Sequence, residues 1–203
     1  MRPRNPLVGF LCWFALIFGL LILPWPGWND LYGQYFRELG RTAFSRDGEK
    51  RIVRFQHHEL QHGFSTLNTQ MTLNNRDLID KAGKGLTATV DLDTRSIGWV
   101  PTALTAALIL ATPVPWRRRW WALFGGLILI HVFILFTLQT WLWNESPELS
   151  LTTLTPFQKE ITDNLEYTFL TQLGASFTVP VLIWLLVTFR REDILRYREH
   201  ENR

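Results

Sequence analysis

The sequence predicts a membrane protein with an all-α core of four transmembrane helices and a small extracytoplasmic α+β domain between the first and second helices. Two observations lead to this prediction. Four long apolar runs are separated by polar segments, although only 47% of the 203 residues are hydrophobic. Arginines are also concentrated in three short segments next to these runs. A helix needs about 20 apolar residues to cross a bilayer, and each run approaches that length.

The predicted spans are residues 7–23, 97–114, 120–143 and 169–189. The two central runs form a hairpin, and its turn carries Arg117, Arg118 and Arg119. Charged side chains are costly in hydrocarbon, so the turn is expected at a membrane face. The first run has the basic start of a signal peptide, but it is long and lacks a small-residue cleavage site. It is therefore interpreted as a retained anchor.

The arginines also predict the orientation. The N-terminal stub, the hairpin turn and the tail after residue 189 are all basic, and short basic segments stay in the cytoplasm. Both termini are therefore expected in the cytoplasm, with the protein in a bacterial inner membrane. The net charge of +3 is the sum of a basic inner face and a slightly acidic outer one, and it does not indicate nucleic-acid binding. The expected partners are the lipid bilayer and other membrane protein subunits.

Five segments follow from this topology. They are a stub with the first helix (1–27), an extracytoplasmic α+β domain (28–96), a transmembrane hairpin (97–143), an extracytoplasmic loop (144–168), and a last helix with a basic tail (169–203).

Within the α+β domain, hydrophobic periodicity predicts a helix that starts after Asn29 or Asp30 and ends near Ala43. Alternating apolar residues predict strands at 67–73 and 86–92, and residues 76–82 are expected to form helical turns.

Small residues predict where the membrane helices meet. Ala103, Ala107 and Ala111 repeat at four-residue spacing, and Gly125-Gly126 offers a complementary small surface. Small side chains let helices approach closely in lipid.

The clearest chemical motif is His58-Glu59-Leu60-Gln61-His62, which matches H-E-x-x-H. On a helix, the two histidines lie one turn apart and can bind zinc, while Glu59 acts as general base. In this respect the segment resembles the zincin metallopeptidases, and the resemblance would make the chain a membrane-anchored zinc peptidase. A third ligand is required, and no second metal-binding motif follows. The alternative interpretation is a polar helix or strand end with surface histidines; no other cofactor is predicted.

His131 lies near the middle of the third predicted span, where an ionisable group by default suggests function. Thr105 and Thr178 fall at similar predicted depth in the second and fourth spans. The structural interpretation is a hydrogen bond that links the three helices. The functional interpretation is a proton relay or a cofactor ligand.

Asp91, Asp93 and Arg95 come at the end of the second predicted strand, just before the membrane. They are expected on the face opposite Val90 and Leu92. One interpretation is mutual charge pairing on a solvated strand, and the other is a site that holds a lipid headgroup or a peptide.

The layout from Arg95 to Pro101, the alanine-rich span, the stretch from Pro113 to Arg119 and Gly125-Gly126 resembles the membrane core of exosortases and archaeosortases. These are multi-span transpeptidases that process sorting signals on exported proteins. Ser96 stands near the place of the family's catalytic cysteine, and His131 stands where an arginine would follow. The resemblance therefore implies a non-catalytic relative.

Since the sequence contains no complete catalytic set, it favours a non-catalytic subunit or assembly partner of an envelope complex. The alternatives are the zinc peptidase and the non-catalytic exosortase-like protein.

Overall fold

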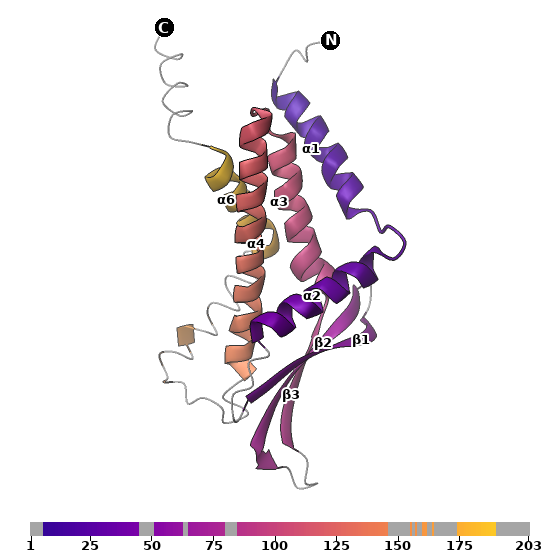
Figure 1. The fold of residues 1–203 in the computed structure, drawn as a ribbon, viewed down its shortest axis with the longest axis vertical. Helices are drawn as coiled ribbons and strands as arrows, with labels where there is room; N and C mark the ends of the chain where they lie inside the picture. Colours follow the sequence, from indigo (N-terminus) through magenta and orange to yellow (C-terminus); the bar gives the residue numbers. More distant parts are fainter. Residues whose placement is uncertain are drawn as a thin grey trace. The chain divides into compact units, whose positions relative to one another are not determined.

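The computed structural model describes residues 6–44, 51–62, 65–79, 85–145 and 174–189, together with Thr155, Phe157, Glu160, Ile161 and Asn164. Its helices are α1 (Pro6–Ile22), α2 (Trp28–Phe44), the π-helical turn η1 (Arg95–Trp99), α3 (Val100–Ala111), α4 (Trp116–Glu145) and α6 (Ala175–Thr188) (Figure 1). Its strands are β1 (Arg51–His62), β2 (Ser65–Ile79) and β3 (Gly85–Leu92).

The chain divides into two compact units. The helical unit consists of Met1–Leu23, Val100–Val132 and Ser176–Arg203, and the sheet unit consists of Pro24–Trp99 and Phe133–Ala175. Helix α4 therefore contributes its first part to the helical unit and its last part to the sheet unit.

The sheet unit contains an antiparallel sheet of order β1-β2-β3. Phe55 of β1 pairs with Met71 of β2, which pairs with Val90 of β3. Because side chains alternate along a strand, Phe55 and Met71 lie on one face with Leu73 and are almost completely buried. The predicted strands at 67–73 and 86–92 are confirmed as parts of β2 and β3.

Helix α2 lies across β1 and β2 (Figure 1). Its 3.6-residue period turns Tyr32, Phe36 and Gly40 toward the sheet, where all three are buried. The predicted helix is confirmed, although it begins at Trp28, directly after Gly27 with φ +74°, so Asn29 and Asp30 lie inside it.

The last part of α4 completes the core of the sheet unit. Ile134, Leu138 and Leu142 repeat every four residues, and none of them is exposed to solvent. They pack in one hydrophobic cluster with the aromatic side chains of α2 and the apolar face of the sheet. The sequence predicted that this whole helix lies in a bilayer, but its last part is packed in the core of the sheet unit.

In the helical unit, α1 packs against α3 (Figure 1). The predicted contact between Gly126 and the alanine face of α3 is not what the structure shows, because a Cβ atom at Gly126 would lie 2.6 Å from Cδ1 of Ile109 and 3.3 Å from Cγ2 of Thr105. Ala103 and Ala107 of α3 are buried as well. The missing side chain at Gly126 therefore makes room for Ile109 of α3.

The predicted four-span all-α membrane core is wrong. Among the described residues, only α4 is long and apolar enough to cross a membrane, over the 29 residues Trp116–Asn144. The other apolar helices, Leu7–Ile22, Arg95–Ala111 and Ala175–Thr188, have at most 17 residues. The chain also forms a three-stranded sheet with its own core.

The reason lies in the helix ends. Hydropathy counts apolar residues, whereas crossing a bilayer needs one continuous helix, because unpaired backbone groups are too costly in lipid. The second apolar run stops being helical at Ala111, just before Pro113 and Pro115. Described helix α6 starts after Gly174, whose φ is +54°. Residues 169–173 lie outside the described residues.

Two local predictions also need correction. Residues 76–79 were expected to be helical but continue β2, while residues 80–82 lie outside the described part of the chain. Strand β1 was not expected; of the side chains of this strand that the structure describes, Val53 and Phe55 are the buried ones. Most of the predicted loop 144–168 and the basic tail after residue 189 lie outside the described residues.

We expect Gly40→Ala to destabilise the sheet unit. The new Cβ would lie 2.7 Å from the ring of Phe55, which is 1% exposed and cannot swing into solvent. Overpacking of this kind costs about 1–3 kcal/mol, against a gain of up to ~1 kcal/mol from helix propensity. Thermal unfolding of the purified protein measures the difference.

The control is Gly19→Ala in α1, because no atom lies within 4 Å of the added carbon. This variant should unfold at or above the wild-type temperature. Replacing Phe55 with leucine in the Gly40→Ala background should recover part of the loss. An unfolding temperature of Gly40→Ala equal to that of wild type would contradict the close packing of α2.

Candidate functional site

The H-E-x-x-H segment lies on strand β1, not on a helix. The β1–β2 register shifts between His57 and Leu60, where His58 and Glu59 stand opposite the single residue Asn68. This two-against-one arrangement is a β-bulge. The helical spacing that would bring His58 and His62 to one zinc ion is therefore missing. His58 is exposed, and the side chains of Glu59 and His62 lie outside the description.

No group of three or more histidine, cysteine, aspartate or glutamate side chains comes together in the described residues to hold a metal. Asn68, the residue of β2 opposite the bulge, makes two hydrogen bonds outside the sheet. Asn68 accepts a hydrogen bond at Oδ1 from the backbone N–H of Thr94, at 3.3 Å, and its carbonyl accepts one from Arg37 of α2, at 3.4 Å. Asn68 thus links the sheet to α2 and to the segment before η1.

His131 and Thr105 make hydrogen bonds within their own helices. Nδ1 of His131 lies 2.7 Å from the carbonyl oxygen of Leu127, which only accepts, so Nδ1 carries the hydrogen. The Thr105 hydroxyl donates to the carbonyl of Pro101, at 2.9 Å. Thr178 is exposed on α6. The interhelical bond between these residues stays a prediction.

The acidic residues after β3 have different partners. Oδ1 of Asp91 accepts a hydrogen bond from Gln70 of β2, at 3.0 Å. Asp93 accepts from the backbone N–H of Arg95, at 2.9 Å, and from the Ser96 hydroxyl, at 2.6 Å. Asp93 is thus a cap for the first helical turn, which begins at Arg95.

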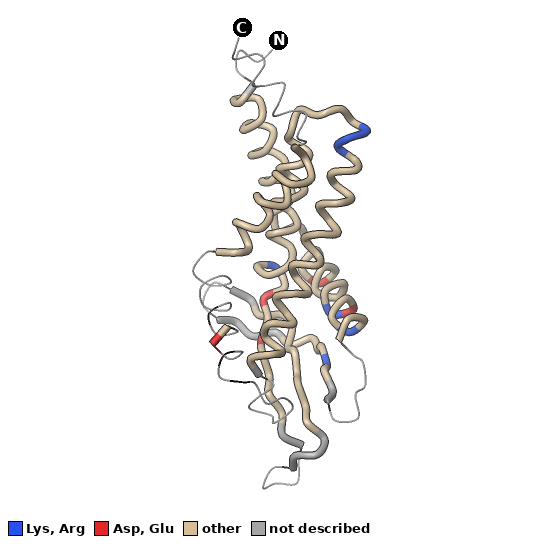
Figure 2. The backbone as a smooth tube through the Cα atoms, turned by 90° about the vertical axis from the view of Figure 1, so that its left-hand side faces the viewer, with Lys and Arg blue, Asp and Glu red and all other residues tan. Residues whose placement is uncertain are grey.

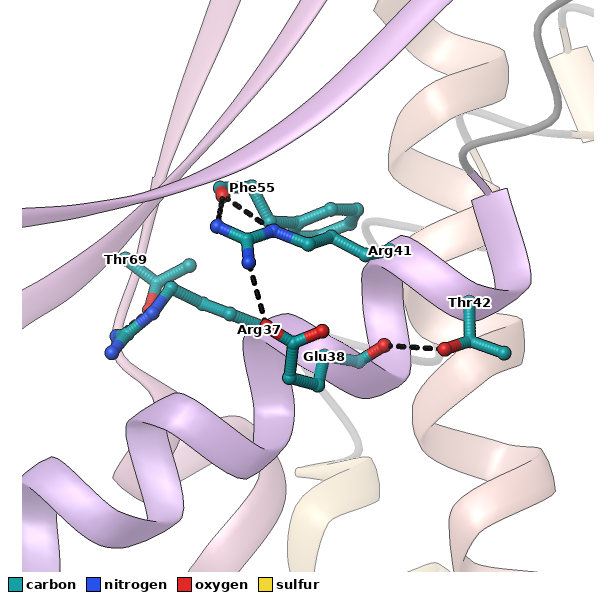
Figure 3. Close-up of polar contacts among 6 residues, drawn as sticks. All are labelled: Arg37, Glu38, Arg41, Thr42, Phe55 and Thr69. Atoms are coloured by element: carbon teal, nitrogen blue, oxygen red, sulfur yellow. Dashed lines mark hydrogen bonds and ion pairs between the residues drawn. The ribbon is translucent and has the colours of Figure 1, made fainter.

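Two arginines of α2 hold the helix on the sheet (Figure 3). Arg41 donates through Nε and Nη2 to the carbonyl oxygen of Phe55, at 3.3 and 2.9 Å. Arg37 donates to Oγ1 of Thr69, at 3.2 Å. Strand β1 is at the edge of the sheet, so Arg41 supplies donors to a strand that has only one neighbouring strand.

Neighbouring charges shift the pKa of Arg37 in both directions. Burial and the positive charge of Arg41 lower the pKa of Arg37, while Asp30 and Glu38 raise it. A guanidinium stays protonated at physiological pH despite such shifts. Arg37 and Arg41 are therefore permanent donors to the sheet.

Beside its buried residues, α2 exposes two large apolar side chains. Leu31 is 59% exposed and Tyr35 is 45% exposed. Because they are four residues apart, they share one face of the helix. Partial burial raises the pKa of the Tyr35 phenol, so the ring stays neutral well above pH 7. We call Leu31 and Tyr35 the outer α2 face. The sequence predicted one apolar stripe of Leu31, Tyr35, Phe36 and Leu39, but only Phe36 of these four is buried, together with Tyr32, Gly33 and Gly40.

The arginine turn of the helical unit bonds to the ends of other helices. Arg118 donates to the carbonyl of Thr188, the last residue of α6. Arg119 donates to the carbonyls of Thr112 and Val114, which follow α3, at 3.0 and 3.4 Å. The Thr188 carbonyl is at the end of its helix, where no residue of that helix donates to it, whereas the Thr112 carbonyl also accepts from the backbone N–H of Val114, at 2.8 Å. The sequence suggested only charge here, because it shows neither the turn that brings Arg119 to Thr112 and Val114 nor the contact of Arg118 with Thr188, 70 residues away.

Trp184 of α6 joins three helices in the same unit. Its indole N–H donates to Oγ1 of Thr112, at 2.8 Å, and its ring stacks with Phe10 of α1, with centroids 5.8 Å apart. Thr112 in turn donates to the carbonyl of Leu108, at 2.7 Å.

Large apolar side chains are exposed on the helices of this unit. They include Leu7, Leu11, Trp13, Leu16 and Leu20 of α1, Trp120, Trp121, Phe124, Ile128 and Val132 of α4, and Phe177, Leu182, Leu185 and Leu186 of α6. Helices α1, α3 and α6 contain no charged residue, as the tan backbone of Figure 2 shows. Contiguous apolar surfaces of this kind indicate contact with a membrane or a partner.

Comparison with protein-family models, curated proteins and solved structures found no match. The resemblance to exosortases therefore stays a prediction based on the residues quoted for it.

We expect Arg41→Gln to destabilise the sheet unit and Glu38→Gln to change it little. Arg41 makes two partly buried bonds to Phe55, and loss of bonds from a charged donor costs about 1.5–3 kcal/mol. Its ion pair with Glu38, at 2.6 Å, is about half exposed and is worth at most ~1 kcal/mol. Chemical denaturation of both variants measures the two effects separately.

Salt provides the second comparison. The loss in Arg41→Gln should persist at 1 M salt, where the Debye length is about 3 Å and surface pairs are screened. Equal losses in the two variants, or a loss that vanishes in salt, would show that the surface ion pair and not the Phe55 carbonyl holds α2.

Proposed function

We propose that the protein is a membrane-held, non-catalytic subunit or assembly partner of a complex in the bacterial envelope. The observation that carries this proposal is the exposed apolar surface of the helical unit. Solitary exposed leucines are normal in soluble proteins, whereas exposed apolar side chains along α1, α6 and the part of α4 after Arg119 are not.

Helix α4 is the proposed crossing helix. Only 33% of its most apolar window is buried inside the protein, whereas the core helix of a soluble protein is mostly buried. Its arginine turn is basic, which favours the cytoplasmic side for the start of α4 and the opposite side for its end. The apolar faces of α1 and α6 would contact lipid or partner helices without needing to cross.

The non-catalytic part of the proposal is supported by how the candidate groups are used. Asp93 caps a helical turn, Asp91 holds Gln70, and Thr105 bonds to its own helix. Each of these groups makes a structural bond. The H-E-x-x-H segment, which prompted the peptidase interpretation, is on a strand.

The outer α2 face is the proposed contact for a partner protein. Arg37 and Arg41 fix the helix to the sheet, so Leu31 and Tyr35 are held in place before any partner arrives. Such preorganisation reduces the entropy lost on binding. A leucine beside a tyrosine suits a partner surface that is apolar at its centre, since tyrosine is enriched at interfaces.

The membrane assignment predicts that the protein stays in the membrane pellet after alkaline carbonate extraction. Cys12 is the single cysteine, so Cys12→Ser gives a background for single-cysteine labelling. In intact spheroplasts, an impermeant maleimide should label Thr42→Cys on α2 but label Pro115→Cys only after permeabilisation. Release by carbonate, or labelling of Pro115→Cys in intact cells, would contradict the proposal.

The partner assignment predicts that proteins co-purify with the full-length chain from native membranes in mild detergent. The double variant Leu31→Ala/Tyr35→Ala should reduce their recovery about tenfold, which corresponds to ~1.4 kcal/mol of binding energy. Thr42→Ala is the matched control, since Thr42 is exposed on the same helix and bonds only the carbonyl of Glu38 in the contacts described above. Recovery of the wild-type protein without partners would refute the subunit assignment.

A further inference from the structure

The three arginines of the turn before α4 have different environments. Arg118 and Arg119 are partly buried and bond to the ends of α6 and α3, and the Arg119 guanidinium also lies 5.3 Å from the centre of the Trp116 ring. Arg117, in contrast, is exposed. Its positive charge is therefore directed to the surroundings of the helical unit.

Arg117 heads a stripe of exposed side chains along α4. Trp121, Phe124, Ile128 and Val132 follow at spacings of three or four residues and so share one face of the helix. They are 67%, 62%, 49% and 56% exposed, respectively. Along α4, the exposed groups of the stripe are first a cation, then an indole, and then a phenyl ring and two aliphatic side chains. At 1.5 Å per residue, it extends about 20 Å from Arg117 to Val132.

This order of groups matches one phospholipid molecule. A guanidinium can hold a phosphate through two parallel hydrogen bonds. Tryptophan favours the headgroup level, because its ring is apolar and its N–H is polar. Phe124, Ile128 and Val132 offer the acyl chain an apolar surface about as long as one leaflet of the roughly 30 Å hydrocarbon core. The first turn of α4 adds the positive end of the helix dipole.

We propose that the stripe from Arg117 to Val132 is a binding site for an anionic phospholipid, with the lipid phosphate on Arg117 and one acyl chain along the exposed face of α4. This inference rests on the proposed membrane location and adds the class of lipid and the residues that select it. Arg118 and Arg119 are excluded from this role, because helix-end carbonyls occupy them.

The test is native mass spectrometry of the delipidated full-length protein in a neutral detergent, titrated with phosphatidylglycerol or phosphatidylcholine. Wild type should bind phosphatidylglycerol about fivefold more tightly, the effect of one basic residue at an anionic headgroup. Arg117→Gln should remove this preference, while Arg117→Lys should keep most of it. Trp121→Ala should weaken both lipids, because it shortens the apolar contact.

Arg54→Gln is the matched control, since Arg54 is an exposed arginine on β1 of the sheet unit, and it should leave the preference unchanged. Unchanged thermal unfolding of Arg117→Gln shows that the variant is folded. A wild-type protein without lipid preference, or an Arg117→Gln variant that keeps it, would overturn the proposal. So would displacement of phosphatidylglycerol by millimolar inorganic phosphate, which would indicate a site for a free anion.

The outcome is separable from that of the proposed function. If the protein resists carbonate extraction but shows no preference between the lipids, the lipid site is refuted and the membrane assignment stands. If carbonate releases the protein, both are refuted.

Discussion

The structure depends on satisfying backbone polar groups at the places where regular structure is interrupted. A carbonyl or N–H without a partner costs about as much as a lost hydrogen bond, and in this chain side chains from distant segments supply the partner. Arg41 does so for Phe55 on an edge strand, Asn68 for Thr94 after β3, and Arg118 for Thr188 at the end of α6. These contacts are long range, so they hold the elements in each unit together.

The same constraint explains why arginine recurs. A guanidinium has five N–H donors in a planar group and remains charged, whereas a lysine has a single ammonium group. Arginine is therefore better suited to donate to carbonyls at the ends of helices. In the turn before α4, this requirement occupies Arg118 and Arg119 and leaves Arg117 exposed. A run of identical residues is thereby divided between holding the fold and facing the surroundings. The exposed apolar residues that follow Arg117 in the stripe form a surface suited to a lipid acyl chain.

Helix α4 shows why an apolar run is ambiguous. Its first part exposes Trp121, Phe124 and Ile128, whereas Ile134 and Leu138 of its last part are fully buried in the sheet unit. Burial by protein and exposure to lipid require the same residue types, since both environments are apolar. Hydropathy therefore predicted the helix but assigned all of it to the bilayer. The proposed function retains one crossing helix and gives the other apolar helices a surface role.

The sequence by itself determined the elements whose signal is local. The helix α2 and the alternation in β2 and β3 were readable, because each depends on neighbours within a few residues. Only the tertiary structure decided the rest: that H-E-x-x-H lies at a bulge, that Asp93 caps a turn, and that Arg118 and Arg119 hold helix ends. In particular, the partner of Arg118 lies 70 residues away in the chain, and chain folding alone brings the two within hydrogen-bonding distance.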